Sequence, residues 1–276
     1  MMDFYQVASA FYEHTFGRAE LEGERGDVAF YVEEARKAGS PVLDLACGTG
    51  RVLTPVAEAG LTVVGLDRSP AMLSTAREKI ARLPHETQQR IELVEGDMRS
   101  FSLDQRFNLI MIPFRSFLHL MTPEDQRQAL GCMRDHLADD GRLVLNIFDP
   151  RLDVIAAHLG PRGPALQKDT EFTHPETGRR VVVWEARRYD PERQVLKEDR
   201  IFEEIGDDGR VVARTYAPLA ARWVYRYEMQ YLLELSGLAV EALYGDYERG
   251  PFRSGGEQIW VTRKGQSGQR TATPEV

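Results

Sequence analysis

Three aspartates in the first hundred residues each follow a short apolar run. Asp44 lies in V-L-D-L-A-C-G-T-G-R-V, Asp67 ends L-T-V-V-G-L-D, and Asp97 follows I-E-L-V-E-G. Beside the first acid, Gly48 and Gly50 permit backbone to approach a ligand where any Cβ would collide. These residue types and spacings indicate a nucleotide-type cofactor, held at turns between strands and helices.

The acids also discriminate between kinds of cofactor. Asp67 stands 17 residues after the second glycine and could accept both ribose hydroxyls of NAD or of another nucleoside. Three details disfavour a dinucleotide: Leu53 stands where the third glycine of its fingerprint belongs, Asp44 would repel a pyrophosphate, and Asp97 is placed to accept from an adenine amino group beside the Met98 N–H. The set suits a ligand with hydroxyls, amines and a positive centre, and no phosphate.

Alternating strand and helix patterns position these residues. Asp27 can cap a first helix, and Ser69-Pro70 and Thr122-Pro123 are typical helix starts. Because each expected strand is nearly all apolar, we predict a doubly wound α/β core with a mostly parallel sheet covered on both faces. Strands are expected at 41–46, 61–66, 91–95, 107–112 and 142–148, and helices at 27–38, 51–59, 69–83 and 122–137.

The pattern changes after Asp149-Pro150. Strand-like runs separated by turn residues predict an antiparallel β insertion, and a helix with two strands then completes the core. The predicted parts are N-terminal helices with the main part of the core (1–150), an insertion that serves as acceptor lid or dimer surface (151–222), the last core elements (223–264) and a flexible tail (265–276). Within them, strands are expected at 180–189, 194–204, 210–216, 239–246 and 257–264, and a helix at 226–236.

Composition narrows the function classes. The chain has 276 residues, 42% of them apolar and 28% charged, with a formal charge of -8 and no dense Lys/Arg tract, which disfavours a sequence-independent nucleic-acid binder. The first residues lack the pattern of a signal peptide, and no apolar run is long enough to span a membrane. Cys47 and Cys132 form neither a disulfide framework nor a metal-type spacing. We expect a cytoplasmic protein without metal, membrane or nucleic-acid partner.

The ordered motifs D-L-A-C-G-T-G, G-L-D-R-S, G-D-M and F-N-L-I-M-I-P-F resemble those of the class I S-adenosylmethionine-dependent methyltransferases, over roughly residues 40 to 264. The resemblance implies a Rossmann-like seven-stranded sheet whose last strand is antiparallel, with S-adenosylmethionine bound across the strand ends. One position departs from the pattern, since Ala46 stands where the first loop glycine is usual.

The resemblance also implies a set of cofactor contacts. The two loop glycines line the methionine and ribose end, Asp67 takes the ribose, Asp97 and Met98 hold adenine, and Ile112-Pro113 lies beside the methyl group. For two residues alternatives stay open: Asp44 contacts the cofactor or anchors the loop, and Arg51 faces the cofactor carboxylate or solvent. The full set is Asp44, Ala46, Gly48, Gly50, Arg51, Asp67, Arg68, Met72, Asp97, Met98, Ile112 and Phe114.

The nearest likeness is to small-molecule N-methyltransferases of the amino-sugar and glycine type, which places two residues at the reaction. His119 matches a residue shortly after the fourth strand and is a candidate general base, its alternative being a packing or positioning role. Tyr12 matches an N-terminal tyrosine over the methionine end, its alternative being simple packing. Further candidates are Phe11, Phe114 and Phe117 for aromatic contacts with the cation, and Arg115, Trp184, Arg222, Trp223 and Tyr225 for an acceptor pocket.

We therefore predict an S-adenosylmethionine-dependent methyltransferase acting on a small molecule, at nitrogen rather than oxygen. The sulfonium already activates the methyl group, so the protein's main task is to align the nucleophile. The alternatives are transfer to oxygen, carbon or a macromolecule, and a non-catalytic S-adenosylmethionine binder. No Pro-Cys or Asn-Pro-Pro-Tyr segment of the nucleic-acid base methyltransferases is present. The oligomeric state is left open, a homodimer being one outcome.

Overall fold

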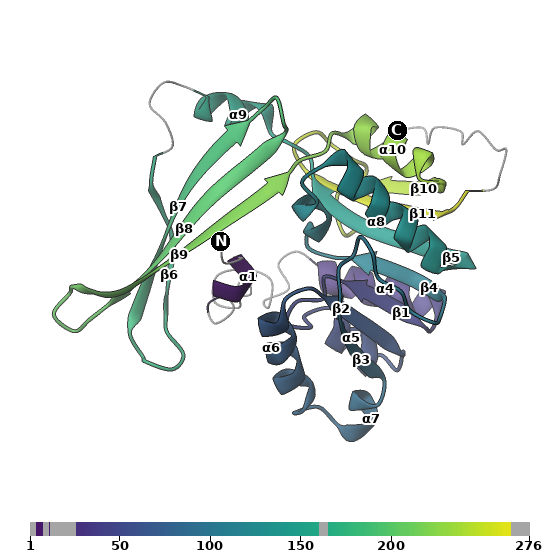
Figure 1. Ribbon diagram of the computed structural model, residues 1–276, viewed down its shortest axis with the longest axis horizontal. Coiled ribbons are helices and arrows are strands. Elements are labelled where there is room, and N and C mark those ends of the chain that lie inside the picture. Colours follow the sequence, from purple (N-terminus) through teal and green to yellow (C-terminus); the bar gives the residue numbers. More distant parts are fainter. Residues whose placement is uncertain (1–3, 8–10, 12–25, 160–164, 266–276) are drawn as a thin grey trace. The chain divides into compact units, whose positions relative to one another are not determined.

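The computed structural model describes residues 4–7, 11, 26–159 and 165–265, and its chain divides into two compact units (Figure 1). One unit comprises Gly26–Pro150 and Trp223–Val276 and is called the core unit here; the other comprises Arg151–Arg222 with the N-terminal segment up to Arg25 and is called the insertion unit. Helix α1 (Phe4–Val7) thus belongs with the insertion, whereas the sequence placed the N-terminal helices with the cofactor core.

The core unit contains a seven-stranded sheet in the order β10-β11-β5-β4-β1-β2-β3. Its strand pairings are parallel except those of β11, the last strand of the chain, which runs antiparallel to both neighbours. This confirms the predicted doubly wound α/β fold. The strands are β1 (Val42–Leu45), β2 (Val63–Asp67), β3 (Ile91–Glu95), β4 (Phe107–Ile112), β5 (Leu137–Phe148), β10 (Leu238–Tyr244) and β11 (Glu257–Lys264).

Two helices begin at the caps that the sequence predicts. The Ser69 hydroxyl accepts from the Met72 N–H at 3.4 Å, and the Thr122 hydroxyl accepts from the Asp125 N–H at 3.1 Å, so both predicted starts are confirmed. The helices of the unit are α4 (Asp27–Ala38), α5 (Leu53–Glu58), α6 (Pro70–Ile80), α7 (His85–Gln88), η1 (Ser116–His119, a 3-10 helix), α8 (Pro123–His136) and α10 (Arg226–Leu235). Helix α5 is shorter than the expected 51–59 because the turn after β1 continues to Val52.

Apolar side chains of alternate strand positions cover the sheet. On one face, Leu109, Met111 and Val144 pack with Tyr31 of α4 and Leu53 of α5 in a single cluster of buried residues. Helix α8 packs on β5 and α10 on β10 (Figure 1). No helix among the described residues is long and apolar enough to cross a membrane.

The insertion unit is a four-stranded antiparallel sheet in the order β6-β7-β8-β9 (Figure 1). The meander expected from sequence is present as β7 (Arg180–Asp190), β8 (Val195–Ile205) and β9 (Val211–Arg222). Two elements were not predicted, β6 (Gln167–Thr173) and α9 (Leu152–His158). Each buries one residue, Phe172 in β6 and Ile155 in α9, so neither shows the apolar periodicity that marks an element in sequence.

Candidate functional site

The turn after β1 has left-handed backbone at three positions. φ is +56° at Ala46, +56° at Gly48 and +84° at Gly50, and the turn is closed by a hydrogen bond from the Gly50 N–H to the Cys47 carbonyl at 2.9 Å. A Cβ at Gly48 would meet nothing within 4 Å, so this side of the turn is open. Alanine at position 46 keeps the conformation at a cost of about 1 kcal/mol relative to a glycine.

Asp67 ties the end of β2 to this turn. One of its carboxylate oxygens accepts from the Gly48 N–H at 2.9 Å and the other from the Ser69 N–H at 2.8 Å. Each oxygen retains lone pairs for a further donor, such as a ribose hydroxyl. Two neighbours of Asp67 belong to the predicted cofactor set. Arg68 is exposed, whereas Met72 is 1% exposed and lies on the buried face of α6.

Asp44 is a buried acid with unused hydrogen-bonding capacity. Its side chain is 1% exposed, and its Oδ1 atom has no hydrogen-bond partner among the described residues. Burial raises the pKa of Asp44 to about 8 and outweighs the opposing charge of Arg51. Burial disfavours the ionised form of Asp44, and a cationic donor would stabilise that form. The buried, unused oxygen therefore fits a ligand ammonium group.

Arg51 is paired rather than solvated, and its contact with the cofactor carboxylate stays a prediction. Its guanidinium forms a two-point ion pair with Asp27, at 2.9 and 2.6 Å, and lies over the Phe114 ring at 5.4 Å. Asp27 begins α4 but does not cap it, because its carboxylate accepts from Arg51 and from the adjacent Val28 N–H. The N-cap is Gly26, so α4 has no side-chain cap. The pair was missed because its members lie 24 residues apart.

Asp97, expected to bind adenine, is engaged by a neighbour. Its carboxylate accepts from the Arg99 guanidinium at 2.6 Å and from the Arg99 N–H at 2.9 Å, and the hydrogen bond with Arg99 lowers its pKa. Arg99 also bonds Asp125 at 2.8 Å. Met98 is half-buried beside this group. Asp97 is therefore ionised and acceptor-only, and its role toward adenine stays a prediction.

The turn after β4 is strained and leads to His119. Phe114 and Arg115 have φ of +57° and +61°, a left-handed pair of non-glycine residues directly after the buried Ile112-Pro113. His119 ends the 3-10 helix that follows and is half-buried. Tyr12, the other predicted catalytic residue, lies outside the described residues.

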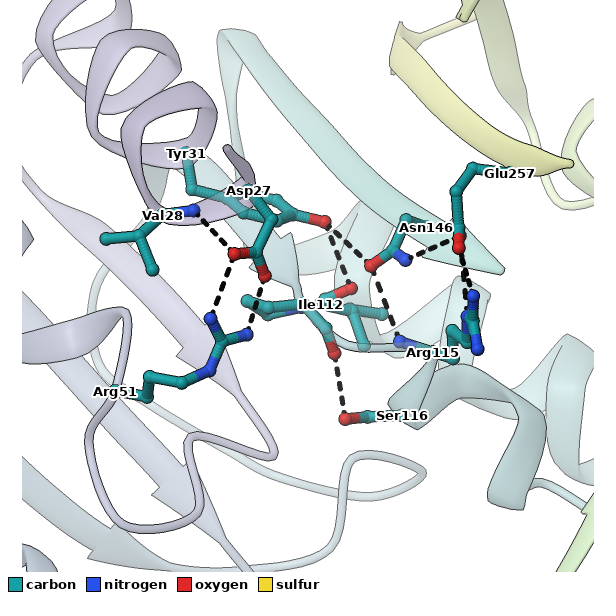
Figure 2. A network of polar contacts seen from close by, with 10 residues as sticks. Asp27, Val28, Tyr31, Arg51, Ile112, Arg115, Ser116, Asn146 and Glu257 are labelled. Atoms are coloured by element: carbon teal, nitrogen blue, oxygen red, sulfur yellow. Dashed lines mark hydrogen bonds and ion pairs between the residues drawn. The ribbon is translucent and has the colours of Figure 1, made fainter. Parts of the chain in front are cut away.

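A buried polar network holds this turn, and Figure 2 shows its members. The Asn146 amide oxygen accepts from the Tyr31 hydroxyl at 3.1 Å and from the Arg115 N–H at 3.4 Å, while its amide nitrogen donates to Glu257 at 3.1 Å. Glu257 also forms an ion pair with the Arg115 guanidinium. Sequence reasoning missed Asn146, although an asparagine inside the apolar strand V-L-N-I-F was a usable signal.

The remaining candidates are distributed over both units. In the core unit Phe117 and Trp223 are buried and Tyr225 is 39% exposed. In the insertion unit the Phe11 ring stacks on Phe202 and meets Phe172 at a tilt, within the apolar cluster of the sheet. The Trp184 indole N–H donates to Glu203 at 2.9 Å, and Arg222 is buried.

These features define an α/β protein that binds a nucleoside cofactor at the carboxyl edge of its sheet. The turns after β1 and β4 lie at adjacent strands, where the strand order reverses, and such a point is where open α/β sheets bind ligands. The cofactor set fits S-adenosylmethionine: a buried acid with one unused oxygen for an ammonium, an anchored acid for ribose and an open glycine turn. Among the described residues no cluster of His, Cys, Asp or Glu could hold a metal ion.

Comparison with known proteins gives the family. Residues 42–141 match the model of a methyltransferase domain. A dTDP-3-amino-3,4,6-trideoxy-alpha-D-glucopyranose N,N-dimethyltransferase of Streptomyces venezuelae is 33% identical over 199 residues, which are 65% of this chain and 79% of the relative. A cypemycin N-terminal methyltransferase of a Streptomyces species is 27% identical over 87% of this chain and 89% of the relative. The solved structure of the CcbJ methyltransferase from Streptomyces caelestis has a TM-score of 0.73 at 25% identity, over 87% of this chain and 90% of that one.

The chain belongs to the class I S-adenosylmethionine-dependent methyltransferases, as its motifs predicted. It is an enzyme whose cofactor is S-adenosylmethionine. The comparisons bear on the family, the cofactor and the fold, whereas the individual contact residues stay predictions that the site geometry makes specific.

Proposed function

We propose that the protein transfers methyl groups to an amine of a small-molecule acceptor of the amino-sugar type. The observation that carries the proposal is the 33% identity to an amino-sugar N,N-dimethyltransferase across 79% of that relative. The acceptor is thus named from the relative, while the site supplies the chemistry. As a second candidate acceptor we name a peptide amino terminus, because the relative of cypemycin type covers 87% of this chain.

In this proposal each site residue has a defined task. Asp44 holds the cofactor ammonium, Asp67 accepts from the ribose, and the Gly48 and Gly50 turn admits the methionine end. Bound S-adenosylmethionine supplies a methyl group activated by a positively charged sulfur. His119, at the end of the 3-10 helix after β4, accepts the proton that the acceptor amine must lose before its lone pair can attack. The proton thus moves to an imidazole nitrogen of His119.

The proposal extends to the setting of the protein. Two free thiols, Cys47 and Cys132, suit a reducing cytoplasm. The absence of a nucleic-acid partner stays a prediction, which tight, salt-sensitive binding of tRNA or rRNA would contradict. The oligomeric state stays open, with a homodimer as one outcome, and the use of the insertion unit to cover the acceptor stays a prediction.

Two variants test the proposal together. Calorimetric titration with S-adenosylhomocysteine should show a Kd about 100-fold higher for Asp67→Ala, since two charge-assisted contacts are lost, and no change for Asp153→Ala, whose carboxylate is exposed on α9. His119→Ala should bind normally but methylate an amino sugar at least about 10-fold more slowly. Mass spectrometry of amino-sugar, hydroxyl-sugar and peptide acceptors then identifies the acceptor atom. Methylation of the hydroxyl sugar alone would refute amine transfer, and unchanged turnover of His119→Ala across pH would reject the base role.

A further inference from the structure

The turn after β4 holds two adjacent residues in a conformation that L side chains avoid. Phe114 and Arg115 both have positive φ, and neither is glycine. Such backbone persists only where its surroundings enforce it, and it gathers at functional sites. The turn follows Ile112 at the carboxyl end of β4, next to the glycine turn of β1 in the strand order, so its shape matters for whatever binds at this edge.

The turn is held on both sides by contacts with other elements. The Phe114 ring packs under the Arg51 guanidinium, which Asp27 of α4 holds through two bonds. On the other side the Arg115 N–H donates to the amide oxygen of Asn146, which also accepts from Tyr31 of α4. Helix α4 therefore supplies both supports from positions four residues apart, on one face of the helix (Figure 2).

Asn146 connects the turn to helix α4 and to strand β11. Its amide can be oriented in one way only, because the Arg115 N–H can only donate and the Glu257 carboxylate can only accept. Through Glu257 it also reaches the Arg115 guanidinium, so both the backbone and the side chain of Arg115 depend on it. Asn146 is 1% exposed, between Leu145 and Ile147, which are both fully buried, so its amide is tolerated there only because its hydrogen bonds are satisfied.

We propose that Asn146 is a positioning residue for methyl transfer, which holds the Phe114–Arg115 turn in its left-handed form and so fixes the acceptor side of the site. The inference rests on the proposed function, since it concerns where the acceptor is held. Asn146 touches neither reacting group. It acts through Arg115, so its loss should lower turnover with an acceptor while the cofactor affinity set by Asp44 and Asp67 is retained.

Asn146→Asp tests this because it changes one donor and almost no volume. Near pH 8 the introduced carboxylate cannot donate to Glu257 and repels it, whereas its protonated form near pH 6 donates as the amide does. The charged and titratable groups that face Asn146 or its partner Tyr31 are Arg115 after β4, Glu257 on β11, Tyr31 and Asp27 on α4, Asp44 on β1 and Tyr247, which follows β10. Asp44 titrates in the wild type as well, so the two proteins are compared at equal pH. Burial raises the pKa of both tyrosines, so neither ionises over this range. We expect kcat/KM to fall at least about 10-fold relative to wild type near pH 8 and to recover to within about threefold near pH 6.

A second measurement separates positioning from simple destabilisation. Hydrogen exchange of the peptide that contains Pro113–Leu120 should be faster in Asn146→Asp than in wild type near pH 8 and equal near pH 6, while the Kd for S-adenosylhomocysteine stays within about threefold. The matched control is Asn108→Asp, whose amide donates to the Ser40 carbonyl at 2.6 Å at the amino end of β4 and should change nothing. If Asn146→Asp fails to fold, Tyr31→Phe, which removes only the hydroxyl donor, should still lower kcat/KM about threefold.

Several outcomes would overturn the inference. They are unchanged kcat/KM and exchange in Asn146→Asp, a loss that does not recover near pH 6, or a parallel loss of turnover and cofactor binding. The exchange measurement needs no acceptor. A wild-type protein that methylates no amine would therefore refute the proposed function, while protection of the 113–120 peptide would still decide the role of Asn146.

Discussion

The two sheets of this protein both bury acids, and they satisfy them in opposite ways. In the insertion unit Glu198 and Arg200 are each 5% exposed and paired with one another, and Arg200 also contacts Asp169 at 3.1 Å and Glu185 at 3.5 Å. In the core unit Asp44 is more deeply buried, yet its Oδ1 atom has no hydrogen-bond partner among the described residues. Charges that neutralise each other within a sheet stabilise the fold, whereas an acid with an unused oxygen is available to a ligand.

The pKa values of the two acids express the same difference. Burial acts to raise the pKa of Glu198, but the charges and hydrogen bonds of Arg200 and Arg187 outweigh it and lower the pKa. At Asp44 burial prevails and raises the pKa to about 8. Ionised Glu198 thus stabilises the folded state above its unfolded pKa and loses that contribution on acidification. Asp44 has the opposite sign, because its folded state retains a proton that the unfolded chain releases.

The largest expected effect is on the insertion sheet. Arg200→Met removes the cation that Glu198, Glu185 and Asp169 share and leaves Arg187 as the remaining partner of Glu198 and Glu185, so the free energy of unfolding should fall by about 3 kcal/mol. Urea denaturation followed by circular dichroism, together with hydrogen exchange of β8, measures it. Arg193→Met, whose side chain is 81% exposed in the β7–β8 turn, is the matched control and should cost less than about 0.5 kcal/mol. A loss below about 1 kcal/mol for Arg200→Met would mean that the ion-pair cluster does not hold the sheet.

The second expected effect is the pH dependence of the free energy of unfolding that Asp44 causes, which is opposite in sign to that of Glu198 in the other sheet. Between about pH 4 and pH 8 the unfolded chain ionises at Asp44 while the folded protein keeps that proton. The free energy of unfolding of the cofactor-free protein should therefore fall as pH rises, by at most about 1.4 kcal/mol per pH unit. Asp44→Asn should remove this slope and be the more stable protein near pH 8, while binding S-adenosylmethionine more weakly because the ammonium loses its anionic partner. Thermal unfolding near pH 5.5 and pH 8 measures the slope.

Asp104→Asn, at an exposed position in the same unit, serves as control and should keep the wild-type slope. If Asp44→Asn and wild type unfold in parallel at both pH values, the acid is not held protonated, and the contrast with Glu198 disappears.

The smallest effect concerns backbone strain. Ala46 in the cofactor turn and Gln194 in the β7–β8 turn both have φ of +56°. Replacing either by glycine relieves the strain but also loosens the unfolded chain, so each should raise the free energy of unfolding by less than about 1 kcal/mol. Only Ala46→Gly should also change the Kd for S-adenosylhomocysteine, since only that turn belongs to the proposed cofactor site. Equal Kd values for the two variants would indicate that Ala46 has no part in shaping the site.

Sequence patterns predicted elements whose signals are local. The side chains of Thr122 and Ser69 cap helices through groups three residues away, and β1 with its aspartate is complete in four residues. Strand β6 was not predicted because Phe172 alone among its seven residues is buried, which leaves no period to detect. The N-terminal helix was assigned to the core because sequence order suggested it, whereas Phe4 and Phe11 belong to the apolar cluster of the insertion unit.

By itself the sequence determined the family, the cofactor and the sheet, because these depend on short motifs in a set order, each recognisable within about ten residues. Tertiary structure alone decided the partners of the charged and polar side chains. Arg51 pairs with Asp27 across 24 positions, Tyr31 with Asn146 across 115, and Arg115 with Glu257 across 142. Such pairings follow from which strand ends meet at one edge of the sheet, and no local pattern encodes that proximity. The acid at the end of β1 was visible from the start, but its unpaired oxygen became evident only once the chain had folded around it.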